Sequence, residues 1–203
     1  MNQPPTEGAQ AVAEDVVQLI MNDHREFERL FAELKSSPER RAGLVPVLTT
    51  LLAAHSRAEE AEVYPVAATE GGNPDDVARS QEEHIAADQL LARLAETDPD
   101  DTDFEQVLDE LVEAITHHLE EEESTVLPHM RQSLSEQRLM ELGQAFLSSR
   151  KEHLGDQPED ITKAELLQQA SNAEITVSRG ASKAQVATKL RREAEKGMEE
   201  EGE

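Results

Sequence analysis

Six side chains that could ligate a metal recur at matched spacings along this sequence. Two segments read HxxxE, and two others carry one histidine directly after an acidic residue. The six residues are His24, His55, Glu59, His84, His118 and Glu122. Imidazoles suit iron, copper and zinc, carboxylates suit harder ions, and the mixture without sulfur is typical of non-haem iron. The set predicts two iron ions, each glutamate reaching both, with positions open for a bridging oxygen and a small ligand.

The six residues belong to an internal repeat. The segment from Asp23 to Leu34 returns as Glu83 to Leu94, and each HxxxE pair is followed at the same distance by a proline. Two helical hairpins related by an approximate twofold axis form an antiparallel four-helix bundle. The repeat would bring one histidine-bearing helix and one HxxxE helix from each half to a shared interior.

Helical spacing places these polar groups on apolar faces. Residues i and i+4 project from the same side of a helix, so His55 and Glu59 point together, as do His118 and Glu122. Apolar residues such as Leu52 continue the same stripes. A polar group left bare in a core costs several kcal/mol. A bound cation would compensate for that cost.

Apolar periodicity and turn residues predict the helices that carry these groups. They are expected over 12–35, from Pro46 or slightly before it to 69, over 74–96 with Asn73 as cap, over 102–130, and over 133–153 opened by a capping box from Ser133 to Glu136. No segment alternates as a strand would. The predicted fold is all-α, an antiparallel up-down four-helix bundle with a short fifth helix and a small C-terminal helix-loop-helix.

The predicted domains follow changes in composition. A disordered lead occupies 1–11, the bundle 12–155, a linker 156–161, a helix-loop-helix unit 162–196 and an acidic tail 197–203. Capping boxes at Thr162–Glu165 and Ser182–Gln185 would open the two helices of the unit. The segment from Ile161 to Met198 carries more basic than acidic residues, unlike the rest of the chain.

Composition excludes several function classes. The formal charge is −25, from 44 acidic and 19 basic residues, which opposes binding to nucleic acid or anionic membranes over most of the surface. The absence of cysteine excludes disulfides, thiolate chemistry and iron–sulfur clusters. The N-terminus has no signal-peptide pattern and no window is long and apolar enough for a membrane span. A cytoplasmic location is expected.

The histidine and glutamate pattern resembles the hemerythrin-type HHE cation-binding family over about residues 12–150. The resemblance rests on a lone His24, HxxxE at 55–59, a lone His84, HxxxE at 118–122, and the prolines Pro65 and Pro128. It implies a diiron centre, oxo- or hydroxo-bridged, that binds oxygen, nitric oxide or peroxide, or that senses iron or redox state. The oxygen carriers of the family have HxxxH where this chain has Ser80 and His84. The missing imidazole favours sensing, or a response to oxidative or nitrosative stress, over oxygen carriage.

Several alternatives remain open at this stage. The same centre could be an enzyme that turns over peroxide or oxidises ferrous iron. Residues 162–196 resemble the Rho N-terminal or SAP-like module, whose basic side chains could bind nucleic acid. The segment has no aromatic residue for base stacking, which favours a protein contact or an inert appendage instead. Tyr64, Glu28 and Asp88 could join the site, with a core-edge role for Tyr64 and salt bridges for the two acids as simpler explanations.

Overall fold

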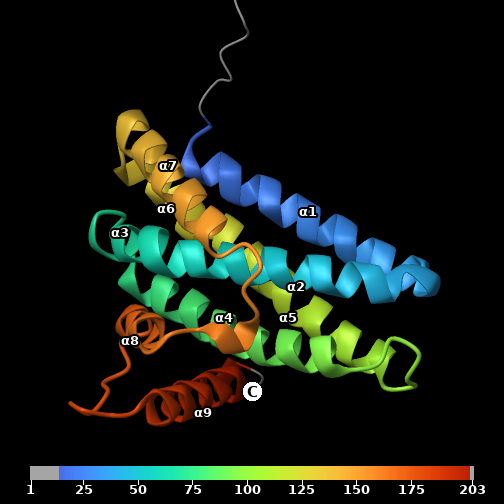
Figure 1. Cartoon of the computed structure of the whole chain (residues 1–203). Helices are drawn as coiled ribbons and strands as arrows, with labels where there is room; N and C mark the ends of the chain where they lie inside the picture. The colour runs from blue at the N-terminus through green and yellow to red at the C-terminus, as the bar shows by residue number, and fades with distance from the viewer. Residues whose placement is uncertain (1–13, 202–203) are drawn as a thin grey trace, which may run out of the picture.

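The computed structural model describes residues 14–201, and all regular elements in this range are helical (Figure 1). This confirms the predicted all-α class for the described part of the chain. The predicted disordered lead and the last two residues of the predicted acidic tail lie outside the described residues. None of the helices described is both long and apolar enough to cross a lipid bilayer.

The helices occur in this order along the chain: α1 (Val16–Ser36), the 3₁₀ turn η1 (Pro38–Arg40), α2 (Arg41–Ala58), the π-helical segment η2 (Glu59–Val63), α3 (Tyr64–Thr69), α4 (Pro74–Glu96), α5 (Phe104–Ser124), α6 (Val126–Ser133), α7 (Glu136–Glu152), the 3₁₀ turn η3 (Pro158–Asp160), α8 (Lys163–Asn172) and α9 (Lys183–Glu201). Helices α1, α2, α4 and α5 carry the six candidate residues or lead directly into them.

Several observed helix starts differ by a few residues from those predicted. Helix α1 begins at Val16 because the Asp15 side chain caps it, accepting the backbone N–H of Gln18 at 2.9 Å. Helix α2 begins at Arg41, so Pro46 lies within its opening turns as predicted, although the regular helix does not begin only at the proline. Pro46 is in the second turn, where its missing N–H costs one backbone hydrogen bond.

The predicted capping box at Ser133 is also wrong. The cap of α7 is Ser135, whose hydroxyl accepts the backbone N–H of Arg138 at 3.2 Å. Ser133 instead ends α6 and donates a hydrogen bond to the Gly71 carbonyl at 3.2 Å.

The two repeated prolines interrupt helices that were predicted to be continuous. Pro65 has no N–H, and just before it the helix widens into η2, where the Tyr64 N–H donates to the Glu59 carbonyl five residues back. In the second half of the repeat, Pro128 has no N–H to donate to the Ser124 carbonyl. The helix is interrupted at Thr125, between α5 and α6. Both breaks come just after the HxxxE pairs.

Two apolar clusters lie on either side of the candidate residues along the helices. On α1, His24 lies between Ile20 of one cluster and Phe27 of the other. On the second HxxxE helix, Glu122 lies between Leu119 and Val126 in the same way. The clusters position the polar residues and shield them from bulk water.

Helices α8 and α9 form a C-terminal unit, defined here as residues 158–201, that packs on α4 (Figure 1). Both predicted capping boxes are present, with Thr162 paired to Glu165 and Ser182 to Gln185. A third apolar cluster joins the unit to α4: Ile85, Leu166, Ala170, Val186, Leu190 and Ala194. Helix α9 continues to Glu201, past the predicted end near residue 196.

Candidate metal centre

The structure brings all six candidate side chains together in the interior. Each has at most 3% of its surface exposed: His24, His55, Glu59, His84, His118 and Glu122. They come from α1, from α2 and the η2 segment that continues it, and from α4 and α5.

Five of the six side chains form two groups that share a carboxylate. One group is His24, His55 and Glu59, and the other is Glu59, His84 and His118; within each, potential ligand atoms lie within 4.8 Å of one another. Glu59 Oε2 is 3.1 Å from His55 Nε2 and 3.5 Å from His84 Nε2. One carboxylate therefore contacts an imidazole of each half of the repeat.

Glu122 is placed in the same way from the opposite half. Its Oε2 is 3.3 Å from His24 Nε2 and 4.0 Å from His118 Nε2. The imidazole rings pair within each group, with centroids 5.3 Å apart for His24 and His55 and 4.5 Å apart for His84 and His118. The arrangement provides two adjacent positions, each with two imidazoles and access to both carboxylates.

The polar atoms facing the middle of this cluster fit a bound cation. The Nε2 atoms of His24 and His55 and both oxygens of Glu59 and Glu122 are buried and make no hydrogen bond. Leaving a buried polar group unsatisfied costs about 1–3 kcal/mol, and more when it is charged. Imidazole and carboxylate donors are those of non-haem iron sites, so cations between these atoms would satisfy them.

Without a cation, the cluster is held by charge pairing between its own members. Burial disfavours a charged His55, but the Glu59 and Asp23 carboxylates outweigh burial and raise the His55 pKa to about 10. Burial likewise disfavours the Glu122 carboxylate, but His24 and His118 lower its pKa to about 2. These opposite shifts reflect positive and negative groups in mutual contact.

Carboxylates next to the HxxxE and lone-histidine positions contact the outer nitrogens of the rings. Asp23 Oδ2 is 3.1 Å from His55 Nδ1, and the equivalent Glu83 Oε2 is 2.8 Å from His118 Nδ1. Such carboxylates fix the orientation and tautomer of a ligating imidazole.

The acids that follow the two glutamates complete this outer layer. Glu123 Oε1 is 2.8 Å from His24 Nδ1, and the equivalent Glu60 Oε1 is 3.5 Å from His84 Nδ1. All four acids belong to the internal repeat, as the pairs Asp23 with Glu83 and Glu60 with Glu123. Their recurrence beside each candidate ligand is the sequence signal for this role.

Comparison with known proteins agrees with this site. The model of the hemerythrin HHE cation-binding domain matches residues 15–130, which is more than half of the chain. The chain belongs to the hemerythrin HHE family. Two curated proteins are similar to it over about two thirds of its length.

An uncharacterized hemerythrin-like protein of Schizosaccharomyces pombe is 26% identical over 136 residues, 65% of this chain and 67% of that protein. A protein of Nostoc sp. named DNA nickase is 25% identical over 147 residues, 71% of this chain but only 42% of that protein. No solved structure matches the chain. The family match does not extend to residues 162–196, so the likeness of that segment to a Rho-type or SAP-like module stays a prediction.

In this hemerythrin-family site Tyr64 is a direct neighbour of the cluster. It is fully buried, and its hydroxyl lies 3.1 Å from His84 Nε2, a nitrogen that faces the shared carboxylate. Burial, with the nearby Glu122 and Glu59 carboxylates, raises the pKa of Tyr64 well above its usual value. The phenol therefore stays neutral, and it lies inside the second apolar cluster, in contact with a candidate ligand, rather than at the edge of the core.

The other candidates raised by the sequence lie elsewhere. Glu28 is about half exposed and pairs with Arg25 at 2.9 Å, and Asp88 pairs with the buried Arg57 at 3.1 Å. Neither is bonded to any of the six residues. His129 contacts Asn73, and the imidazole of His153 lies beside Asp156. Neither of these two contacts involves any of the six candidate residues.

Proposed function

We propose that this hemerythrin-family protein holds two non-haem iron ions and binds a small ligand such as oxygen, nitric oxide or peroxide, in sensing or in the response to oxidative or nitrosative stress. The observation that carries the proposal is the sharing of Glu59 and Glu122, each within reach of imidazoles from both halves of the repeat. In this assignment His24 and His55 hold one ion, and His84 and His118 hold the other.

The proposal includes the arrangement of the four main helices. We assign α1, α2, α4 and α5 to the antiparallel up-down bundle that the repeat predicts, with the two hairpins related by an approximate twofold axis. The crosswise contacts of the two glutamates and the matched outer carboxylates support this symmetry, because each contact in one half has a counterpart in the other.

The residues of the chain define what can happen at the site. When bound, iron would supply a one-electron redox couple and coordination positions not filled by protein. Two imidazoles per position, with Ser80 rather than a third histidine on α4, leave room for a small ligand. The apolar clusters exclude bulk water, and the neutral Tyr64 hydroxyl offers a hydrogen bond beside the His84–His118 position.

The test begins with metal-free protein loaded anaerobically with ferrous iron and then exposed to nitric oxide or oxygen. The account predicts about two irons per chain and new absorption bands in the near-ultraviolet or visible range after exposure. A protein that keeps less than one iron per chain, or whose spectrum does not respond to either gas, would refute it. Sustained release of oxygen from added hydrogen peroxide, lost in Glu59→Ala, would instead identify the peroxide-consuming enzyme.

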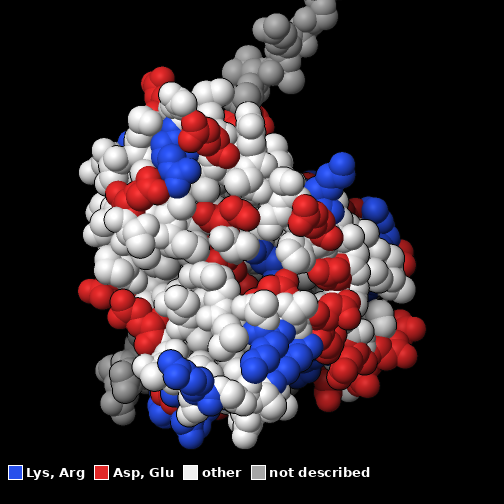
Figure 2. All heavy atoms as spheres, turned by 60° about the vertical axis from the view of Figure 1, so that its left-hand side comes forward, with Lys and Arg blue, Asp and Glu red and all other residues white. Residues whose placement is uncertain are grey.

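A second candidate function is contact with nucleic acid through the C-terminal unit. Lys and Arg side chains gather in the lower part of the face shown in Figure 2, where α8 and α9 lie. One similar protein is named a DNA nickase, although this chain covers less than half of it. Phosphate contacts make binding fall steeply with salt.

We test this second function by measuring retention of a labelled duplex or single strand at low and moderate salt. Replacing the exposed Arg191 and Arg192 by glutamine should weaken retention and flatten its salt dependence. If the wild-type protein retains neither the duplex nor the single strand at low salt, this function is eliminated. The metal proposal is not affected by that result.

A further inference from the structure

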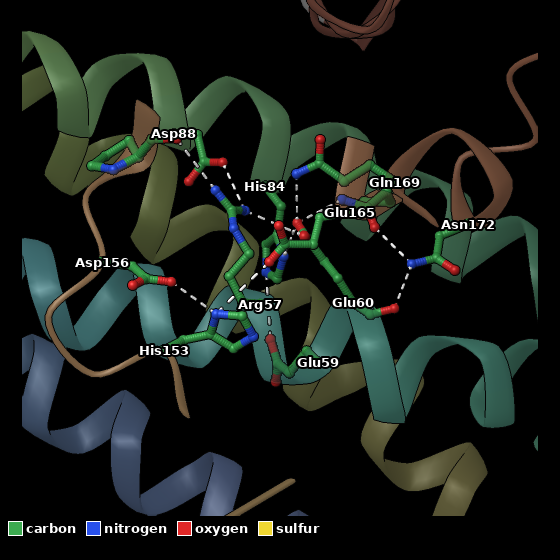
Figure 3. Close-up of polar contacts among 12 residues, drawn as sticks. Arg57, Glu59, Glu60, His84, Asp88, His153, Asp156, Glu165, Gln169 and Asn172 are labelled. Atoms are coloured by element: carbon green, nitrogen blue, oxygen red, sulfur yellow. Dashed lines mark hydrogen bonds and ion pairs between the residues drawn. The ribbon is translucent and has the colours of Figure 1, made fainter. Parts of the chain in front are cut away.

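A buried polar network joins the C-terminal unit to the segment that follows the first HxxxE pair (Figure 3). Glu60 Oε1 accepts hydrogen bonds from Gln81 Nε2 of α4 at 2.9 Å and from Gln169 Nε2 of α8 at 3.0 Å. The Glu60 backbone carbonyl accepts Asn172 Nδ2 at 3.0 Å, and the same amide reaches Gln81 Oε1 at 2.8 Å. All four residues are buried.

The second oxygen of Glu60 is also tied to the C-terminal unit. Glu60 Oε2 accepts from Arg57 at 3.3 Å, and this buried guanidinium also donates to the Pro158 carbonyl of η3 at 3.5 Å. Asp88 balances the charge of Arg57 at 3.1 Å. Oε1 of Glu60 therefore contacts a side chain of the C-terminal unit directly. Oε2 contacts Arg57, which is itself hydrogen-bonded to that unit (Figure 3).

Glu60 also faces the outer nitrogen of a proposed ligand: its Oε1 lies 3.5 Å from His84 Nδ1, within ion-pair distance but without a hydrogen bond. We propose that Gln169 and Asn172 of α8 are positioning residues of the metal site, which hold Glu60 beside His84 and thereby couple docking of the C-terminal unit to metal binding at the His84–His118 position. This inference rests on the proposed function and extends it to a part of the chain outside the family match.

Within residues 14–201, the other half of the repeat has no buried network of this kind around its outer carboxylate. Glu123, the counterpart of Glu60, contacts His24 Nδ1 and is held by Arg25 of α1, whose side chain is 53% exposed. The Glu123 side chain is itself 24% exposed, against 3% for Glu60. The docked C-terminal unit therefore makes the two metal positions unequal, and only one of them should respond to changes in α8.

Coupling of this kind acts equally in both directions. If docking of α8 tightens metal binding by some factor, metal binding must favour docking by the same factor. The buried amides of Gln169 and Asn172 donate to the Glu60 and Gln81 oxygens, and an unpaired buried amide is costly. Any change that moves Glu60 away from His84 must therefore also disturb the contacts of α8.

The first test replaces Gln169 with methionine, which has a similar volume but cannot donate a hydrogen bond. Ferrous affinities are measured anaerobically by competition with a chelator, and Gln137→Met on the exposed face of α7 is the matched control. Loss of an outer partner usually weakens metal binding about 10–100-fold. We expect this loss for one of the two ions in Gln169→Met, and wild-type affinities for both ions in the control.

The second test needs no variant, so it does not depend on the folding of Gln169→Met. Hydrogen exchange of the α8 backbone amides is measured in wild-type protein with and without ferrous iron. We expect iron to slow this exchange by about the factor by which Gln169→Met weakens the affected ion.

The outcomes separate this inference from the function on which it rests. If the wild-type protein binds no iron, both the proposed function and the coupling are refuted. The coupling alone would be refuted if a folded Gln169→Met protein bound two ions with unchanged affinities. It would also be refuted if iron did not alter hydrogen exchange in α8. Equal weakening of both ions would also contradict it, because only the His84–His118 position contacts Glu60.

Discussion

The substitution Glu59→Gln tests whether one carboxylate serves both metal positions. Glu59 is fully buried, and its Oε2 lies 3.1 Å from His55 Nε2 and 3.5 Å from His84 Nε2. Glutamine keeps the size of the side chain but removes its charge. The account predicts weaker binding of both ions, whereas His55→Gln should weaken only the ion held with His24.

Metal-dependent stability gives this prediction a magnitude. At free ferrous iron about 100-fold above the dissociation constant, each occupied position stabilises the folded chain by about 2.7 kcal/mol, or about 5.4 kcal/mol for two. For a chain of this size, 1 kcal/mol corresponds to about 2–4 °C in Tm, so wild type should gain about 11–22 °C. His55→Gln should keep about half of this gain. If Glu59→Gln weakens each ion a hundredfold, about 0.4 kcal/mol per position remains.

The assay is anaerobic thermal unfolding followed by far-ultraviolet circular dichroism, with and without ferrous iron at one fixed free concentration. Glu62→Gln is the matched control, because it makes the same chemical change on η2 at a partly exposed position outside the cluster. It should keep the wild-type gain. A full gain in Glu59→Gln, or the same half gain in Glu59→Gln and His55→Gln, would refute the shared carboxylate.

Three further predictions follow from the structure. Asp23→Asn should weaken ferrous binding about 10–100-fold in a chelator competition, because Asp23 contacts His55 Nδ1. The control Asp109→Asn, at an exposed position, should not change the affinity. Equal effects of the two substitutions would contradict an orienting role for Asp23. Tyr64→Phe should lower the free energy of unfolding of the metal-free protein in urea by about 0.5–1.5 kcal/mol, while an unchanged midpoint would mean that the hydroxyl contributes no net hydrogen bond. Alanine at Gly143, where a Cβ would lie 3.0 Å from the Glu14 carbonyl oxygen, should destabilise by about 1–3 kcal/mol. Alanine at Gly43 in α2, where nothing lies within 4 Å, should stabilise by about 0.5–1 kcal/mol in the same assay, and a common sign for both would contradict the packing described.

The sequence was sufficient to predict the all-α fold and the helices that carry the candidate residues. Apolar periodicity identifies helices directly, and the repeat of the lone histidine and the HxxxE pair indicated which helix faces meet. The cap at Asn73 and both capping boxes of the C-terminal unit were predicted because these contacts join residues close in sequence.

The predicted helix boundaries were inexact where a proline lies within an apolar helical pattern. Continuous helices were expected through Pro65 and Pro128, because the apolar pattern continues past both prolines. The missing N–H groups instead produce the π-helical segment and the break at Thr125. A pattern of hydrophobic residues does not report which backbone bonds survive.

The contacts of the C-terminal unit could not be predicted because they depend on tertiary packing. Gln169 and Asn172 look like polar residues of a short surface helix, and Glu60 looks like one of many surplus acids. Their burial is possible only because each satisfies the others across elements distant in sequence. Sequence position alone therefore gave no indication that α8 reaches the neighbourhood of His84.

Anomalous diffraction at the iron edge from crystals loaded anaerobically with ferrous iron tests the central claim most directly. The account predicts two peaks per chain, one beside His24 and His55 and the other beside His84 and His118, with both glutamates in contact with each. A single peak, or peaks away from these residues, would contradict it.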